Sequence, residues 1–348
     1  MAVQSLAVKY RPSVFEDVTE QGAVITILRN QLETNTVNHA YLFAGPAGCG
    51  KTSMARIFAK EINNGHGNPI EIDAASHNSV DDVRSLIQQA KTQSIDSEYK
   101  IFILDEVHAL SNNAWQAMLK LIEEPPAKSI FIFCTTDPQK IPKTILSRVQ
   151  RYDFQRISQQ GIVDRLAYIL GQENLRARGS QEEAIAYIAK IADGHLRDAI
   201  TMMDKSLSYS DDLTIENVIT VLGVVDYEQM FDITDAILHA DVHIVLDIIN
   251  KFYMSGKDIK QFVRSYLDFI LDVCKYGLLE GRTESQSMSY IKIPKLYGDR
   301  LATFSDRDIE QCVHLLDTLV KLNAEIKWNT SPKELVESVL VLESVKEV

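Results

Sequence analysis

The sequence predicts an α/β domain, in which helices cover both faces of a parallel sheet, followed by a small helical domain and a larger all-helical domain. Two observations lead to this prediction. Between Ala40 and Cys134, short apolar segments alternate with helical patterns, which is typical of parallel strands buried on both faces. After Phe154 the strand patterns fade, while helical spacing of apolar residues continues. The predicted domains are residues 1–157, 158–223 and 224–348.

Four apolar segments are the predicted strands, and a helical pattern follows each of the first three. In chain order the strands are Ala40–Ala44, Pro69–Asp73, Lys100–Leu104 and Ser129–Cys134. The helices between them are Lys51–Ile62, Val80–Lys91 and Asn112–Glu124. The last helix ends before Pro125 and Pro126, because proline disfavours helix in the residue that precedes it.

The second predicted domain consists of helices. They are expected at Ile162–Gln172, Gln181–Ala192, Leu196–Leu207 and Ile215–Leu222. Gly194 and Gly223 stand where two of the helices should end. From Asp226 onward the spacing of apolar residues is again that of amphipathic helices, so the third domain is expected to be helical throughout.

Charge and cysteine usage narrow the class of protein. The formal net charge of −12 argues against a chain coated in basic residues for gripping DNA, although a local basic strip remains possible. No apolar run reaches the ~18 residues that a membrane span requires. The four cysteines form no CxxC pair, which is typical of a reduced, cytoplasmic protein. They are Cys49, Cys134, Cys274 and Cys312.

The segment from Gly45 to Thr52 matches the pattern GxxxxGK[ST] between a predicted strand and a predicted helix. It consists of Gly45, Pro46, Ala47, Gly48, Cys49, Gly50, Lys51 and Thr52. Glycines allow the backbone N–H groups to face phosphates, and the helix N-terminus adds a positive dipole end. Lys51 supplies charge to the β- and γ-phosphates, and the Thr52 hydroxyl suits Mg²⁺. We interpret Cys49 as a small spacer and not as a redox site.

Polar residues follow the third and fourth predicted strands. Asp105 suits a role in holding Mg²⁺, and Glu106 would orient or deprotonate the attacking water. This pair favours hydrolysis over binding alone. Thr136 is expected to touch the γ-phosphate or that water, or else to satisfy loop backbone groups. For His108 two interpretations stay open, a link between the site and DNA or a cap on the next turn.

Six further motifs accompany the phosphate loop in one order along the chain. The N-terminal motif consists of Lys9-Tyr-Arg-Pro12, Phe15, Asp17-Val18 and Gln21, with Glu20 where the pattern KYRPxxFxDVxGQ has glycine. The others are Ile70–Ser76, Leu104–His108, Leu121–Pro126 with Thr135–Lys140, and Gly194–Ala199. Together they resemble the AAA+ clamp-loader ATPases, among them the bacterial DNA polymerase III gamma/tau subunits. The motifs run from Lys9 to Ala199, and the helical remainder is similar only in layout.

The resemblance implies an AAA+ domain, a helical lid and a helical collar, and it gives roles to residues by position. Arg148 matches the arginine of the family's Ser-Arg-Cys motif, an arginine finger that reaches into a neighbouring subunit's ATP site. Arg197 matches the lid arginine that senses the γ-phosphate in its own subunit. Thr136 matches the first sensor. The segment that lines the adenine site is matched by Arg11, Pro12 and Val18.

The family uses ATP and Mg²⁺ to load a ring-shaped sliding clamp onto primed DNA. The resemblance therefore implies an ATPase that acts within a polymerase III-type holoenzyme, in a bacterial cell or a virus-infected bacterial host. Its expected partners are the clamp, delta- and delta-prime-like subunits, primer–template DNA and further copies of itself in a pentameric ring. No membrane partner is expected.

Three features depart from the family pattern. Bacterial members usually carry a four-cysteine zinc module between the first helix and the second strand, but Glu61–Pro69 contains no cysteine. His66 alone cannot form a tetrahedral zinc site, so we expect no zinc. Val149 replaces the cysteine of the Ser-Arg-Cys motif, while the arginine is kept. Because the chain ends after the third domain, a gamma-like role is expected rather than a tau-like one.

Contacts with DNA and with the clamp are expected at separate positions. Clamp loaders track the phosphate backbone, and Arg84, Lys140 and Lys143 are the candidates for such contacts. The alternative for each is ordinary solvated charge. Trp115 lies where the family contacts the clamp, and Trp is enriched in interface hot spots. Its alternative is a core position against the sheet.

Two other functions compete with clamp loading. A branch-migration motor of the AAA+ class would carry a winged-helix DNA-binding domain at its C-terminus, which the helical pattern after Asp226 does not suggest. A nucleotide-locked scaffold, like the delta-prime subunit, would have lost its phosphate loop. Here Lys51, Thr52, Asp105 and Glu106 are all present.

Overall fold

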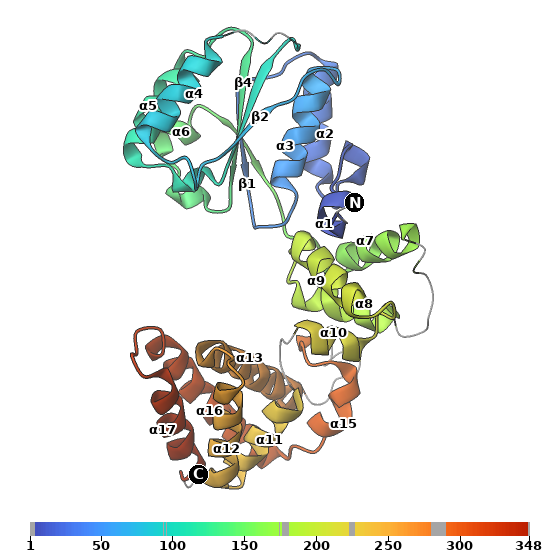
Figure 1. The fold of residues 1–348 in the computed structure, drawn as a ribbon, viewed down its shortest axis with the longest axis vertical. Coiled ribbons are helices and arrows are strands. Elements are labelled where there is room, and N and C mark those ends of the chain that lie inside the picture. Colours follow the sequence, from blue (N-terminus) through green and yellow to red (C-terminus); the bar gives the residue numbers. More distant parts are fainter. Residues whose placement is uncertain are drawn as a thin grey trace. The chain divides into compact units, whose positions relative to one another are not determined.

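The computed structural model describes residues 4–92, 94, 96–173, 175, 181–222, 227–279 and 290–346. The chain forms two compact units, Met1–Leu213 and Thr214–Val348, which run from blue to red along the sequence in Figure 1. The predicted boundary at residues 223 and 224 lies outside the described residues, and the division into three domains stays a prediction.

Five parallel strands form the sheet of the first unit, in the order β2-β3-β4-β1-β5. They are β1 (Ala40–Ala44), β2 (Ile70–Asp73), β3 (Lys100–Asp105), β4 (Ser129–Thr135) and β5 (Gln150–Asp153). The four predicted strands are confirmed, with each end within one residue of the prediction. β5 escapes a search for apolar runs, because only Tyr152 among its four residues is buried.

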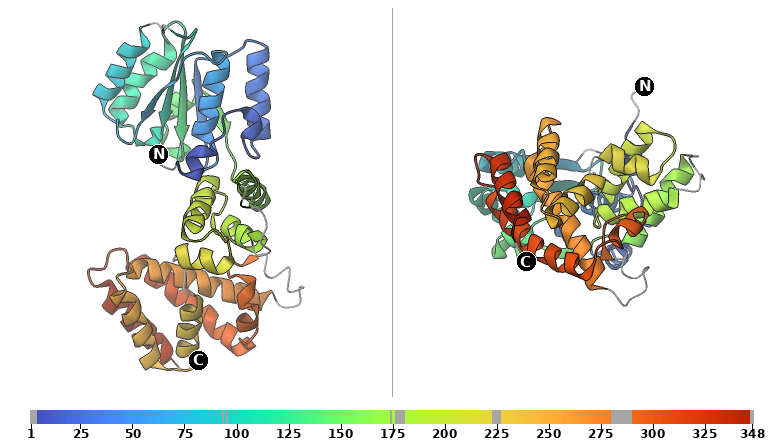
Figure 2. Two further views of the ribbon diagram at one scale, coloured as in Figure 1. Left: turned by 45° about the vertical axis from the view of Figure 1, so that its right-hand side comes forward. Right: turned by 90° about the horizontal axis from the view of Figure 1, so that it is seen from below.

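Helices cover both faces of this sheet, as Figures 1 and 2 show. α2 (Gly22–Glu33) and α3 (Lys51–Ile62) pack on one face, and α4 (Val80–Ala90), α5 (Asn112–Glu123) and α6 (Lys143–Leu146) pack on the other. Side chains along a strand point alternately to the two faces. Tyr41 and Phe43 of β1 accordingly join the first core, while Leu42 joins the second.

Local sequence explains where these helices begin and end. The Ser79 hydroxyl accepts from the backbone N–H of Asp82, whose carboxylate in turn accepts from the Ser79 N–H, and this capping box starts α4. Ser111 caps α5 in the same way by accepting from the Ala114 N–H at 3.2 Å. The predicted helices of the α/β domain are confirmed, and α2 is an additional one.

In the part of the first unit that the structure describes, three helices after the sheet form a small bundle of their own. They are α7 (Gln159–Gln172), α8 (Gln181–Ile191) and α9 (Leu196–Tyr209). The short N-terminal helix α1 (Leu6–Lys9) packs against α9. The Leu6 N–H donates to Asp204 Oδ2 at 3.0 Å, and the Arg165 guanidinium donates to the Tyr10 carbonyl oxygen at 2.9 Å. The N-terminal segment is thereby bound to the helical bundle although it precedes the sheet in sequence.

The described part of the second unit is helical, as predicted from Asp226 onward. Its helices are α10 (Ile215–Leu222), α11 (Tyr227–Leu238), α12 (Val242–Met254), α13 (Ile259–Leu278), α15 (Gly298–Leu301), α16 (Asp306–Glu325) and α17 (Pro332–Ser344). The long helices α13 and α16 pack along each other and contribute fully buried side chains such as Tyr266 and Leu319. No helix in the described part of the chain is both long and apolar enough to cross a lipid bilayer.

Candidate functional site

A cavity of about 620 Å³ opens in the first unit, where three parts of the chain meet. The N-terminal segment contributes residues between Ala7 and Thr19, the predicted phosphate loop contributes Ala47–Ser53, and helix α9 contributes Leu196 to Asp198 and Ile200. The ends of β2 and β3 form its floor, with Asp73 and Asp105 paired in register.

The strand order explains why these parts converge. All five strands are parallel, so their carboxyl ends share one edge of the sheet, and ligands of such sheets bind outside that edge where the strand order reverses. β4 lies between β1 and β3. The residues that follow β4 therefore stand between the phosphate loop after β1 and the acidic pair after β3.

The phosphate loop has the backbone that its sequence requires. A side chain at Gly45 would place its Cβ 2.5 Å from the Phe154 carbonyl oxygen, so only glycine fits there. Gly50 has φ 102° and precedes α3, whose first residue is Lys51. The Lys51 ammonium is nearly buried and donates to the carbonyl oxygens of Gly45 at 2.9 Å and Pro46 at 2.7 Å. The loop thus holds a positive charge beside the N-terminal end of a helix, where a phosphate group would bind.

Cys49 lies inside this loop with 2% of its surface exposed, and its thiol donates to the Pro46 carbonyl oxygen at 3.0 Å. Burial raises the pKa of the Cys49 thiol, which makes the reactive thiolate scarcer. Both observations agree with the interpretation of Cys49 as a spacer.

The two residues predicted to hold a metal ion are in contact. The Thr52 hydroxyl donates to Asp105 Oδ2 at 2.7 Å, although 53 residues separate them in sequence. A hydroxyl and a carboxylate are hard oxygen ligands of the kind that Mg²⁺ prefers, completed by water and nucleotide phosphate. The residues present therefore fit a magnesium ion bound together with a nucleotide.

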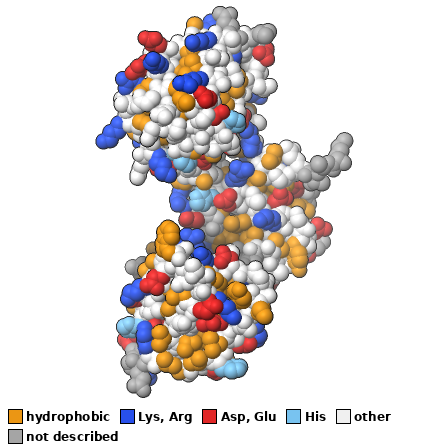
Figure 3. Space-filling view, turned by 60° about the vertical axis from the view of Figure 1, so that its left-hand side comes forward, with side chains coloured by type: hydrophobic (Ala, Val, Ile, Leu, Met, Phe, Trp, Pro, Cys, Tyr) orange, Lys and Arg blue, Asp and Glu red, His pale blue; other side chains and the backbone are white. Residues whose placement is uncertain are grey.

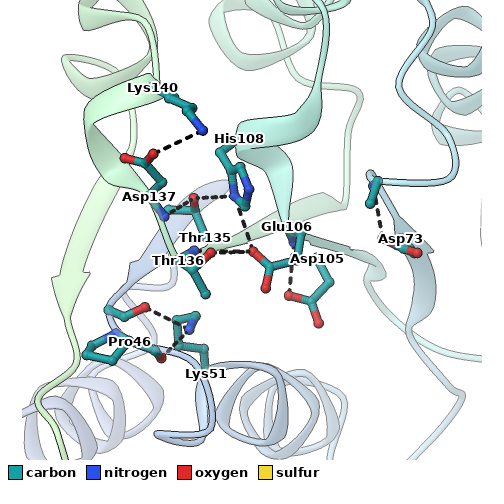
Figure 4. Close-up of polar contacts among 12 residues, drawn as sticks. Pro46, Lys51, Asp73, Asp105, Glu106, His108, Thr135, Thr136, Asp137 and Lys140 are labelled. Carbon is teal, nitrogen blue, oxygen red and sulfur yellow. Dashed lines mark hydrogen bonds and ion pairs between the residues drawn. The ribbon is translucent and has the colours of Figure 1, made fainter. Parts of the chain in front are cut away.

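Glu106 and Thr136 also come together, as Figure 4 shows. The Thr136 hydroxyl donates to Glu106 Oε2 at 2.9 Å, and the Thr136 backbone N–H donates to the same oxygen at 3.3 Å. Glu106 has φ 50° and ψ 43°, a left-handed conformation that non-glycine residues seldom adopt and that is enriched at functional sites. His108 Nδ1 lies 3.2 Å from Glu106 Oε2.

Several arginines line the cavity, and one of them belongs to the predicted adenine segment. Arg11, Pro12 and Val18 line it together with Arg197 of α9. Burial lowers the pKa of the Arg11 guanidinium, and the positive charges of Arg56 and Arg197 lower it further. Arg56 pairs with Glu71 across the cavity lining. This concentration of guanidinium groups suits a polyanionic ligand.

Sequence reasoning missed several residues of this region. Arg56 and Arg165 line the cavity but stand in no recognised motif. Glu20 occupies the family's glycine position, and its φ of 59° explains why glycine suits that position. Its carboxylate accepts from the Ser158 N–H at 2.7 Å and from the Ser158 hydroxyl, so Glu20 connects the N-terminal segment to the start of α7. For Glu20, the departure from the family's glycine was the one feature of the sequence that indicated a structural role.

Arg148 lies elsewhere and is not among the residues that line the cavity. It follows α6, and its side chain is 40% exposed. Its guanidinium donates to Glu123 Oε1 and to the Thr144 carbonyl oxygen, both at 2.8 Å. An exposed arginine outside its own subunit's cavity is what a residue acting on a neighbour would require.

The clamp contact predicted for Trp115 is wrong for this conformation. Trp115 is 2% exposed and packs in the core on Phe133, with ring centroids 6.1 Å apart. The helical spacing of α5 directs position 115 toward the sheet along with Ala114 and Met118. The alternative interpretation, a core tryptophan, describes this side chain.

The three candidates for DNA contacts are exposed. Arg84 pairs with Asp81 at 2.9 Å, and Lys140 pairs with Asp137 at 3.3 Å, while Lys143 begins α6. Basic and acidic side chains are interspersed over the face of the molecule in Figure 3. DNA binding by these residues stays a prediction. Among the described residues, no group of three His, Cys, Asp or Glu side chains could hold a metal ion, and the absence of zinc also stays a prediction.

Three family models match successive parts of the chain. The model of the DNA polymerase III delta subunit matches residues 20–77 and 64–158. The ATPase lid domain of the DNA polymerase III clamp loader subunit matches residues 161–212, and domain III of the DNA polymerase III gamma and tau subunits matches residues 213–342.

Curated relatives carry the same names. DNA polymerase III subunit tau of Bacillus subtilis is 35% identical over an alignment that covers 98% of this chain and 63% of that protein. DNA polymerase III subunit gamma of Buchnera aphidicola is 32% identical, with 78% of this chain and 81% of that protein covered. The chain thus spans about 63% of the length of the Bacillus subtilis protein.

Among solved structures, the RuvB Holliday junction branch migration motor of Thermotoga maritima has a similar fold. It superimposes with a TM-score of 0.52 and 20% identity, covering 66% of this chain and 79% of that one. At this identity the similarity concerns the fold alone, and it supports the predicted AAA+ architecture.

Proposed function

Since the chain belongs to the family of DNA polymerase III gamma and tau subunits, we propose that it is an ATP-driven motor subunit of a clamp loader. In this role it opens a ring-shaped sliding clamp and places it on primed DNA. The observation that carries the proposal is a single cavity shared by the phosphate loop, the acidic pair and the lid arginine Arg197.

Each group in the cavity has a part in ATP hydrolysis. Lys51 and the loop N–H groups bind the phosphates. The segment with Arg11, Pro12 and Val18 contacts the adenine of the nucleotide. Thr52 and Asp105 would hold Mg²⁺, which neutralises phosphate charge. Glu106 orients or deprotonates the attacking water, with Thr136 beside it. Arg197, on the first turn of α9, senses the γ-phosphate and so links nucleotide state to the lid.

Arg148 completes the site of a neighbouring subunit in this proposal. Its exposure and its absence from the lining of its own subunit's cavity support a role between subunits. An arginine supplied by a neighbour stabilises the charge that develops on the transferred phosphoryl group. A subunit on its own should therefore hydrolyse ATP feebly, and assembly should stimulate it.

The proposed partners follow from the family. They are a sliding clamp, delta- and delta-prime-like subunits, primer–template DNA and further copies of this chain in a pentameric ring, in the cytoplasm of a bacterial or virus-infected cell. Arg84, Lys140 and Lys143 are proposed to contact the DNA backbone. ATP and Mg²⁺ are the proposed cofactors, without zinc.

The two competing functions have less support. A delta-prime-like scaffold would lack a working phosphate loop, whereas Lys51, Thr52 and Asp105 are all present here, and the Thr52 hydroxyl donates to Asp105. A branch-migration motor would carry a winged-helix domain, whereas residues 213–342 match domain III of the gamma and tau subunits. The fold likeness to RuvB does not distinguish between motors.

The decisive experiment is steady-state ATP hydrolysis with primed DNA, the cognate clamp and the partner subunits, each omitted in turn. Stimulation that requires both clamp and primer–template supports the loader. Stimulation by DNA alone, indifferent to the clamp, would point to a translocating motor. ATP binding without turnover in the complete mixture would support the scaffold.

A further inference from the structure

Helices α13 and α16 pack along each other in the second unit, and two contacts define how their residues pair (Figure 1). Lys260, in the first turn of α13, donates through Nζ to the Lys327 carbonyl oxygen, just beyond the end of α16, at 3.4 Å. Near the other end of α13, a Cβ built on Gly277 would lie 2.6 Å from Cδ1 of Ile309, in the first turn of α16. The start of each helix therefore lies beside the end of the other, so the pair is antiparallel.

This register places Cys274 of α13 opposite Cys312 of α16. Cys274 stands three residues before Gly277, and Cys312 stands three residues after Ile309. In an antiparallel pair, a step of nearly one turn back along one helix is matched by an equal step forward along the other. Both side chains are buried, with 3% of Cys274 and 0% of Cys312 exposed, so both face the packed interior.

The electrostatics of the two thiols agree with this placement. Both cysteines are free in this structure. Burial raises the pKa of the Cys312 thiol, and the neighbouring Cys274 raises it further, because two thiolates would repel each other. Burial raises the pKa of the Cys274 thiol to about 11. Both groups are therefore protonated near neutral pH, and Cys274 is the one that ionises first.

Gly277 allows the two helices to approach each other closely beside this pair of thiols. Glycine has no side chain to separate the helices, whereas the Cβ of any other residue at position 277 would clash with the Ile309 side chain. A disulfide needs Cβ atoms about 3.5–4.5 Å apart, a separation that facing positions reach only where two helices approach closely. Cys274 and Cys312 lie one turn from this close approach, which favours a bond between their sulfur atoms.

We propose that Cys274 and Cys312 are a dithiol site, which a low-molecular-weight disulfide oxidises to a disulfide bond between α13 and α16. Cys274 loses its proton to solvent and attacks one sulfur of the small disulfide, which forms a mixed disulfide and releases one small thiolate. Cys312 then loses its proton and attacks Cys274 Sγ, which forms the protein disulfide and releases the second small thiolate. Each released thiolate takes up a proton. The two cysteines lose two electrons in total, and the small disulfide gains them.

The bond would close the chain between the two helices into a loop that includes α15. Closing a loop restricts the unfolded chain, so oxidation should stabilise the second unit. The inference goes beyond the proposed function, because the dithiol site needs neither ATP nor a clamp, and either proposal can fail without the other.

Refolding of the full chain from urea in a buffer of reduced and oxidised glutathione, at a pH of about 8.5, tests the site without requiring access to buried thiols. After the remaining thiols are blocked, peptide mass spectrometry should find one bond, between Cys274 and Cys312, and hydrogen exchange in α13 should slow several-fold. Four free thiols, glutathione on either cysteine without the crosslink, or a bond to Cys49 or Cys134 instead would each overturn the inference.

Matched variants test the register of the two helices. Cys312→Ala should abolish the crosslink and leave glutathione on Cys274, whereas Cys134→Ala, which removes a buried cysteine of the first unit, should keep the crosslink. In Gly277→Ala the new methyl group pushes against Ile309, so the crosslinked fraction should fall several-fold, and adding Ile309→Ala should restore it. An unchanged fraction in Gly277→Ala would contradict the close approach on which the site depends.

Discussion

The nucleotide cavity of the first unit and the helical core of the second unit use polar groups in different ways. In the cavity, polar contacts join strand ends that are far apart in sequence, such as Thr52 with Asp105 and Glu106 with Thr136. In the second unit, the buried hydroxyl of Ser344 donates to the Leu340 carbonyl oxygen four residues earlier in its own helix, which satisfies a buried group without bringing distant elements together. Thr234 donates in the same way to Met230, and its hydroxyl also lies 3.0 Å from the Tyr266 hydroxyl of α13.

Backbone strain separates the two regions as well. Glu20 and Glu106 have left-handed φ values of 59° and 50°, and both belong to the region of the cavity. In the second unit, Ala240, in a turn between helices, is the described non-glycine residue with positive φ. Asn35, Asn64, Lys128 and Asp193 of the first unit also have positive φ without lining the cavity, so the contrast rests on Glu106 at the cavity itself, where such strain points to function. Apolar side chains make up most of the buried residues of the helical unit. The variants below test whether this contrast extends to behaviour.

The largest effect is expected from Arg148→Ala in the assembled loader. Loss of an arginine finger should lower ATP turnover by roughly 10³–10⁵-fold and leave ATP binding intact, because the guanidinium acts on the transition state of a neighbour. Single-turnover hydrolysis and nucleotide binding in the reconstituted complex measure both quantities. Arg151→Ala is the matched control, since Arg151 is an equally exposed arginine paired with Asp153. Normal turnover in the Arg148 variant would refute the role between subunits.

Glu106→Gln should lower kcat by about 10²–10⁴-fold, the usual contribution of a general base. Glutamine keeps the shape and can still accept from the Thr136 hydroxyl, so the fold and ATP affinity should persist. Steady-state kinetics and a melting temperature check this prediction. Glu98→Gln serves as the control because Glu98 is an exposed carboxylate in the same unit. If the variant hydrolysed ATP at the wild-type rate, another group would have to activate the water.

Phe231→Ala should lower the stability of the second unit and leave ATP binding unchanged. Phe231 is fully buried, with the Phe269 ring 4.9 Å away edge-on and the Arg300 guanidinium 4.9 Å above its face. Truncation should cost about 3–5 kcal/mol in the free energy of unfolding of the second unit. Hydrogen exchange in α11 and α13 measures this cost, while ATP binding should stay at the wild-type level.

The exposed Val320 on α16 supplies the control for Phe231, since Val320→Ala should change stability by less than about 0.5 kcal/mol. A loss of ATP affinity that parallels the loss of stability in Phe231→Ala would break the comparison. The cavity would then depend on the helical unit for its shape.

The sequence could predict features that depend on local pattern, and it could not predict those that depend on contacts between distant elements. The phosphate loop and four strands are found from local pattern, because glycine spacing and apolar runs are determined within a few residues. β5 and α2 were not predicted because few of their residues are apolar and buried, namely Tyr152 in β5 and Val24 and Leu28 in α2. β5 belongs to the sheet because it pairs with β1. Trp115 was ambiguous since a tryptophan suits an interface as well as a core, and only the orientation of α5 resolves it.

Contacts of the site depend on topology, which the sequence pattern conveys only in part. Thr136 and Glu106 meet because β4 and β3 are neighbours in the sheet, and the bond between them follows from that order. The sequence could not predict that Arg56 and Arg197 lie near Arg11 and lower its pKa, because both belong to elements outside the motif that contains Arg11. The roles of Arg148 and Arg197 came from family resemblance and stay predictions.

The smallest effect concerns Asp272, a buried carboxylate of the second unit with 3% of its surface exposed. Burial raises its pKa above the ordinary 3.8, while the N–H of Lys292 and the charge of Lys275 act in the opposite direction. The folded state therefore takes up a proton at higher pH than the unfolded state. The contribution of Asp272 to stability should rise as pH falls through its folded pKa toward 3.8, by at most about 1.4 kcal/mol per pH unit.

Asp272→Asn removes this titration, so the difference in unfolding free energy between wild type and variant should shift in favour of the wild type as pH falls from neutral. Urea unfolding followed by hydrogen exchange in α13 measures this difference at each pH. Asp268→Asn, an exposed carboxylate on the same helix, is the control. A shift in the opposite direction would mean that Lys275 and Lys292 outweigh burial. The second unit would then contain a polar site that is stabilised by specific partners, as the cavity of the first unit is. The distinction between a packed apolar core and a polar site would no longer separate the two units.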